Sequence, residues 1–272
     1  MKNKICSFLV LLISVATSCN NDKTKEAGEN TPQQGSPAYV KELATAVAKR
    51  PDSVGLRFNY IAALDSVGNY KVALEQVDSL LAHDKGNYAL WFKKAQISEH
   101  AGDTTSAIRF YNAALNIYQA PDGLLALANL YAETKNPKTI EICQHIDEMR
   151  LGRDYDAYTA FFAGVYFARI GTNDKAIQLF DKSIDNNYTL MDAYIEKGYI
   201  YYETKKFNEA LNVFSTAVSV NNRFADAYYW QGKCLEALNK KQEAINKYQQ
   251  ALTLDNTIPE AQEAIKRIKW KG

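Results

Sequence analysis

From residue 38 to the end, the chain is a succession of helix-like segments in which apolar and polar positions are separated. Apolar side chains at helical spacing gather on one face, which then packs against a neighbouring element. No stretch of any length shows the strict apolar and polar alternation that predicts a strand. The pattern therefore predicts an all-α protein.

The helix-like segments repeat along the chain. The stretch 226–255 corresponds position by position to 192–221, so that Ala244 falls where Ala210 does. The same interval of 34 residues recurs upstream, from Ala176 to Ala210 and from Ala73 to Ala107. Between Ala107 and Ala176 the interval is 69 residues, which leaves room for a further, degenerate unit. The aligned alanines are Ala73, Ala107, Ala176, Ala210 and Ala244.

A helix-turn-helix period of about 34 residues resembles the tetratricopeptide repeat. In that family, small residues let the first helix (helix A) approach the second (helix B), and a large residue fills the next turn. The small residues of helix A are Ala95, Gly164, Gly198 and Gly232, and the large residues of helix B are Tyr111, Phe180, Phe214 and Tyr248. The resemblance covers residues 54–258, although Asn or Lys mostly replaces the proline that usually closes each repeat.

The resemblance implies a right-handed superhelical solenoid of about six helix-turn-helix units, with a capping helix at each end. We expect units near 54–87, 88–121, 122–156, 157–190, 191–224 and 225–258, and capping helices over 38–50 and 259–271. The third unit lacks the second alanine and has Asn136-Pro137 in its turn. It is either a drifted repeat or a bend in the solenoid.

The first 18 residues predict a secretory leader. Lys2 and Lys4 precede an apolar run, 5–15, which is about half the ~20 residues that span a bilayer as a helix. Small residues then lead directly into Cys19, which resembles the lipobox of bacterial lipoproteins, and the Ser-Cys junction is familiar among Bacteroidetes. The resemblance implies a signal peptide over 1–18 and a Cys19 that carries acyl chains such as palmitate. The alternative is an ordinary signal peptide followed by a chance cysteine.

Residues 20–37 are polar and contain Gly and Pro, which predicts a flexible tether after the lipidated cysteine, so that the anchor region covers 19–37. As a random coil, such a tether spans about 25 Å. We therefore expect a membrane-anchored protein of a Bacteroidetes-like cell envelope, held at the outer membrane and facing the periplasm or the surface.

Charge and composition exclude several classes of function. Lys and Arg total 32 against 31 Asp and Glu, for a net charge of +1, so the chain has no polycationic character for nucleic acid. His83, His100 and His145 fall in different units without metal-ligand spacing. No phosphate-binding loop or nucleophile elbow is present. We expect no enzyme activity, metal, cofactor or small-molecule substrate.

Cys143 and Cys234 belong to the third and sixth units. Stacked helical layers about 10 Å thick would separate them beyond the reach of a disulfide, so we expect two small buried apolar residues.

The family resemblance also implies a protein-binding groove on the concave side, formed by helices A. The residues expected to line this groove are Phe58, Phe92, Tyr158, Phe161, Ile195, Tyr199, Tyr202, Tyr229 and Lys233. Aromatic residues are enriched at binding hot spots, so we expect a peptide or helix of another envelope protein there. Alternatively, some rings only pack between adjacent helices A, or the protein is a structural subunit of an outer-membrane assembly or secretion complex.

Two further patterns have more than one interpretation. The basic cluster 266–271 with Trp270 either touches anionic lipid or is a solvated cap face. The triplets at 52–54, 65–67, 78–80 and 103–105 resemble a short Bacteroidetes O-glycosylation motif, or they are turn and helix-cap residues.

Overall fold

The computed structural model describes residues 36–270, and in this range the regular elements are fourteen helices. The expected leader, Cys19 and nearly all of the tether lie outside the described residues. The helices are α1 (Pro37–Lys49), α2 (Val54–Ser66), α3 (Tyr70–Leu81), α4 (Tyr88–His100), α5 (Thr104–Leu115), α6 (Pro121–Glu133), α7 (Lys138–Glu148), α8 (Arg153–Arg169), α9 (Asn173–Asn186), α10 (Met191–Glu203), α11 (Phe207–Val220), α12 (Ala225–Ala237), α13 (Lys241–Leu254) and α14 (Pro259–Trp270).

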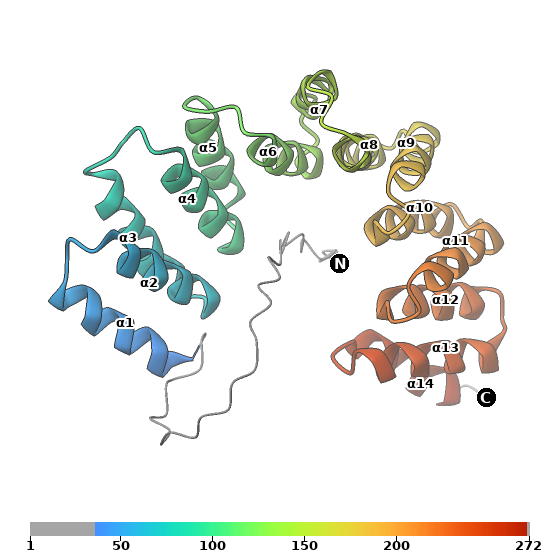
Figure 1. Cartoon of the computed structure of the whole chain (residues 1–272). Helices are drawn as coiled ribbons and strands as arrows, with labels where there is room; N and C mark the ends of the chain where they lie inside the picture. Colours follow the sequence, from blue (N-terminus) through green and yellow to red (C-terminus); the bar gives the residue numbers. More distant parts are fainter. Residues whose placement is uncertain (1–35, 271–272) are drawn as a thin grey trace, which may run out of the picture.

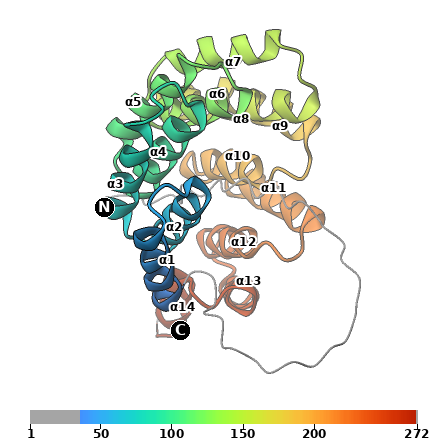
Figure 2. The ribbon, with the colours of Figure 1, turned by 60° about the vertical axis from the view of Figure 1, so that its left-hand side comes forward.

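The helices form an open arc (Figure 1). From α2 to α13 they pair as helix A and helix B, and the helices A (α2, α4, α6, α8, α10, α12) lie inside the arc while the helices B lie outside it (Figure 1). The turned view shows that the pairs also wind into a superhelix (Figure 2). The predicted all-α solenoid of six helix pairs is confirmed.

Within the last three pairs, glycine on helix A makes room for a ring on helix B. A methyl group on Gly164 would lie 2.7 Å from the ring of Phe180, and one on Gly232 would lie 2.7 Å from that of Tyr248. Gly198 faces Phe214 in the same way. Since these contacts are far below van der Waals distance, the glycines let the paired helices approach closely.

All six turns between helix A and helix B close in the same way. The second turn residue has a positive φ and is Gly68, Gly102, Lys135, Gly171, Lys205 or Asn239. The next residue donates its backbone N–H to a carbonyl five residues earlier, as from Asn69 to Leu64 at 2.9 Å. This is the Schellman arrangement, which satisfies carbonyl groups at the end of helix A.

The third pair keeps both helices, but its turn spans four residues, 134–137, and α7 has only 11 residues. The buried residues of α7 are Thr139, Cys143 and Ile146, so this helix B contributes no buried aromatic ring to the interface. Helix α8 begins at Arg153, about one turn before the predicted boundary at 157, directly after Gly152 with φ 102°. The combination of φ 102° and ψ 175° at Gly152 is essentially restricted to glycine, and it separates α7 from α8.

Helices α1 and α14 close the two ends. Ser36 accepts a hydrogen bond from the backbone N–H of Tyr39 at 3.2 Å and caps α1, so this helix begins at the end of the stretch assigned to the tether. In α14, Arg267 pairs with Glu236 at 2.8 Å, whereas Trp270 is 92% exposed. One member of the basic cluster is therefore engaged within the fold.

Candidate protein-binding surface

Four aromatic residues of the inner helices α10 and α12 pack together, and we call them the aromatic cluster: Tyr199, Tyr202, Tyr229 and Trp230. The ring centroid of Trp230 lies 5.3 Å from that of Tyr199, 5.5 Å from Tyr202 and 5.6 Å from Tyr229. All four residues are only partly buried. Three were predicted for the groove, while Trp230, which joins them, was missed because it lies outside the positions that the family pattern implies.

A lysine extends this cluster. The Lys233 ammonium lies 5.5 Å from the centre of the Tyr202 ring, in the arrangement of a cation–π contact. Burial raises the pKa of Tyr229 to about 12, with the nearby carboxylate of Glu260 as the next cause. The hydroxyl of Tyr229 therefore stays neutral and can act as a hydrogen-bond donor at physiological pH.

The remaining predicted residues spread along the arc. Phe92 stacks on Tyr88 with 5.6 Å between ring centroids, and Tyr158 stacks on Phe162 at 6.2 Å. Phe58 and Ile195 are partly buried and pack against core clusters of the first and fifth pairs. The structure thus brings Tyr199, Tyr202, Tyr229 and Lys233 together, with Ile195 packed against the same core cluster as Tyr202. Phe58, Phe92 and Tyr158 belong to other inner helices along the arc.

The prediction that Phe161 lines the groove is corrected by the structure, because this side chain is buried and is not available to a partner. It is 7% exposed, and its ring centroid lies 5.5 Å from Phe162 and 5.9 Å from Phe180. Its core cluster includes residues of α6, α7 and α9, since α8 packs against all three helices. A partner has no access to a ring that is covered from several sides.

An ion cluster crosses three inner helices. The Arg169 guanidinium on α8 makes two 2.9 Å hydrogen bonds to Glu133 on α6 and two more, also 2.9 Å, to Glu196 on α10. The Arg169 and Glu196 side chains are 17% and 9% exposed. Hydrogen bonds to Glu196 and Glu133 raise the Arg169 pKa although burial opposes the charge. Such bidentate pairs fix the geometry of neighbouring helices.

Carboxylates of the inner helices are also bound to the tyrosines of helices B. Tyr111 donates to Glu99, and Tyr248 donates to Glu236, each at 2.9 Å and each across twelve residues. Burial raises the pKa of Glu99. In the fourth and fifth pairs, phenylalanine takes the place of this tyrosine on helix B. The residue twelve positions earlier, on helix A, is then not a carboxylate. Tyrosine and glutamate therefore occur together in this chain because a buried hydroxyl needs an acceptor.

Near the first pair, Asp65 holds two side chains of α4. It accepts from the Lys93 ammonium at 2.8 Å and lies 2.8 Å from Nδ1 of His100. The Asp65 carboxylate is thus paired within the fold.

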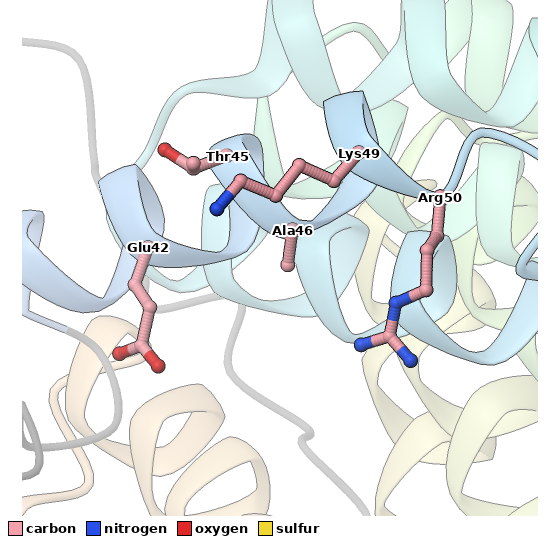
Figure 3. A pocket seen from close by; sticks show the side chains of 5 residues that line it. All are labelled: Glu42, Thr45, Ala46, Lys49 and Arg50. Atoms are coloured by element: carbon pink, nitrogen blue, oxygen red, sulfur yellow. The ribbon is translucent and has the colours of Figure 1, made fainter.

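Two shallow hollows lie in the described part of the chain. One, of about 350 Å³, is lined by Glu42, Thr45, Ala46, Lys49 and Arg50, all from α1 and the residue after it (Figure 3). The other, of about 190 Å³, lies by α13 and Tyr228. A ligand pocket brings polar groups from several elements together, and the first hollow has a single helix for its lining.

Other chemical features of the described residues are sparse. Among residues 36–270, no three His, Cys, Asp or Glu side chains are placed to hold a metal ion. No helix in this range is both long and apolar enough to cross a bilayer. Cys143 and Cys234 are buried and unpaired, and burial raises the pKa of each thiol to about 12.

The fold defines a class: helical-repeat solenoids, which are interaction scaffolds with an extended inner surface. The family model for the tetratricopeptide repeat matches residues 61–123 and 195–259. The chain is therefore similar to the tetratricopeptide repeat over these two segments, and its fold is that of a tetratricopeptide repeat solenoid. The two matches leave out the middle of the arc, where the third pair departs from the pattern.

Solved structures show the same fold. A tetratricopeptide repeat protein from Parabacteroides merdae is 18% identical with a TM-score of 0.66, covering 85% of this chain and 91% of that one. A chain of the APC/C hetero-tetramer Cut9-Hcn1 is 14% identical, with a TM-score of 0.60 and coverage of 86% and 46%. Yeast Tom70 is 14% identical, with a TM-score of 0.57 and coverage of 85% and 57%. Comparison with curated proteins finds no match.

Proposed function

We propose that this protein is a non-catalytic scaffold that binds a peptide or helix of a partner protein on the inner face of its arc. The aromatic cluster carries this proposal, because it combines four partly exposed rings on consecutive inner helices. Rings of this kind supply large contact area at low entropic cost. The open arc of helices is suited to an extended ligand (Figure 1).

We further propose that the scaffold is a lipoprotein of the cell envelope. The proposal is supported by the leader, the small residues before Cys19 and the polar stretch that follows, all of which lie outside the described residues. Anchorage would confine the inner face to one membrane and raise the effective concentration of partners there. The lipid chains stabilise anchorage by about 0.8 kcal/mol for each buried CH₂.

Photo-crosslinking can test the inner face as the binding surface. Lys233 and Lys247 are a matched pair, since each ammonium lies over a tyrosine ring, at 5.5 Å and 5.4 Å, but α12 is an inner helix and α13 an outer one. A photoreactive residue at 233 should crosslink a partner in the producing cell, and one at 247 should not. Equal yields at both positions, or none at 233, would dispose of the inner-face proposal.

Anchorage has its own test. Cys19→Ala should move the protein from the membrane fraction to the soluble fraction and stop the incorporation of labelled palmitate, because the thiol that accepts the acyl chains is gone. Cys143→Ala is the control, since this buried thiol has a raised pKa and should not influence fractionation. A Cys19→Ala protein that still incorporates labelled palmitate, or an unchanged protein that incorporates none, would refute the lipoprotein proposal.

A further inference from the structure

Several cations of the inner helices, and one of the capping helix α14, are paired with carboxylates within the fold. Arg169 is bound by Glu133 and Glu196, and Arg267, at the C-terminal end, is bound by Glu236. Near the other end, Lys93 is bound by Asp65. These cations are therefore compensated within the fold, whereas Lys233 on α12 forms no ion pair with a described residue.

Two carboxylates on the same face have no such partner. Asp192 and Asp226 occupy equivalent positions in the first turns of α10 and α12, and neither forms an ion pair with any described residue. Asp226 is exposed and Asp192 is half-buried. Lys233 lies two turns further along α12 and is directed to the Tyr202 ring. The negative charge of the two carboxylates is therefore not compensated locally.

Their electrostatic environment is negative as well. Burial raises the pKa of Asp192, and the negative charges of Glu196 and Asp226 raise it further. Although Asp226 as a residue is exposed, partial desolvation of its carboxyl group raises its pKa, and the negative charge of Asp255 raises it further. No cation contributes to either shift, so a positive group brought by a ligand would relieve this repulsion.

Rings lie beside these carboxylates. Tyr158 on α8 is close enough to Asp154 and Asp192 for both charges to raise its pKa, after burial. Tyr199 and Tyr229 belong to α10 and α12, the two helices that carry Asp192 and Asp226. Carboxylates next to aromatic faces suit lysine and arginine, whose charged ends pair with the acid while their stems and cations lie on rings.

We infer that the inner face from α8 to α12 binds a partner segment rich in lysine or arginine, with Asp192 and Asp226 as the acceptors for two of its cations. The inference rests on the proposed function and adds the chemistry of the partner. Packed helices lie about 8–10 Å apart, and an extended chain rises about 3.3 Å per residue. Cationic residues three positions apart in an extended segment therefore match the two carboxylates.

Fluorescence anisotropy with the full-length protein in detergent tests the inference. The probe is a labelled peptide with lysine at every third position and leucine or alanine between, and its counterpart has glutamate in place of lysine. The lysine peptide should bind, and Asp192→Asn with Asp226→Asn should weaken it by roughly tenfold, since both partner charges become unpaired. The glutamate peptide should not bind measurably.

The matched control removes two carboxylates from outer helices. Asp174 and Glu209 lie in the first turns of α9 and α11 and are exposed, so Asp174→Asn with Glu209→Gln changes net charge equally. This control should change affinity by less than about twofold. An equal loss in both double variants would show non-specific attraction and overturn the inference, as would binding of the glutamate peptide. Thermal melts should show that both double variants remain folded.

The crosslinking experiment separates this inference from the proposed function. If position 233 captures a partner segment with lysine or arginine at three-residue spacing, both stand. A captured segment without cations would overturn the inference and leave the inner-face scaffold intact. No capture at 233 would overturn the scaffold proposal itself, whatever the peptides show.

Discussion

Replacing Gly198 with alanine should destabilise the solenoid by about 3 kcal/mol, at the upper end of the range for overpacked cores. The added methyl group would overlap the ring of Phe214, which is fully buried between α10 and α11. The ring has no free space to move into, so the paired helices must separate. Chemical denaturation followed by circular dichroism would measure the loss.

Gly55 provides the control for Gly198. It also lies in an inner helix, α2, but a methyl group there meets nothing within 4 Å. Gly55→Ala should therefore leave stability unchanged or raise it by up to about 1 kcal/mol, because alanine is the better helix former. Gly198→Ala combined with Phe214→Leu should recover much of the loss. If Gly198→Ala were as stable as Gly55→Ala, glycine would not be what allows the close approach of these helices.

Replacing Arg169 with methionine should cost about 3 kcal/mol, because it leaves the buried Glu196 carboxylate without a counter-charge. Glu133 also loses its partner, but it is 44% exposed and can be solvated. Since the cluster joins α6, α8 and α10, the middle of the arc should loosen before the ends. Hydrogen exchange of these three helices, together with a denaturation curve, would detect both effects.

Arg223→Met is the matched control for Arg169. Arg223 is exposed in the loop before α12, and its side chain forms no ion pair with a described residue, so the change should stay within about 0.5 kcal/mol. Arg169→Met with Glu196→Gln should cost less than Arg169→Met alone, since no unpaired charge remains buried. Equal costs for the single and double variants would mean that lost packing, not lost charge pairing, explains the effect.

The repeat pattern was sufficient to predict most of the fold. Small residues recurring at the repeat interval predicted both the helix pairs and the rings they face, because the approach of helix A to helix B depends on residues within one unit. Glycines at the repeat interval also indicate the turns within the pairs, because Gly68, Gly102 and Gly171 occupy the turn position with positive φ in three units. Lys135 and Lys205 adopt the same conformation without being recognisable from residue type.

The binding surface was predictable only in part. The family pattern identifies positions on helix A, and it found three members of the aromatic cluster but missed Trp230. It also assigned Phe161 to the surface, although that ring is buried against Phe180 of α9. The pattern assumes an identical environment in every unit, and it does not show that this ring of helix A packs against helix B of its own pair.

The sequence by itself determined the helices, their period and the close approach within each pair, since these depend on propensity and on neighbours in the same unit. Only the tertiary structure decided which charges are paired and which rings stay accessible. Arg169 finds its acceptors 36 and 27 residues away, in the units before and after its own. Asp192 and Asp226 find no cation at all among the described residues. The physical reason is that pairing across units depends on how they stack, and stacking is set by the packing of whole helices.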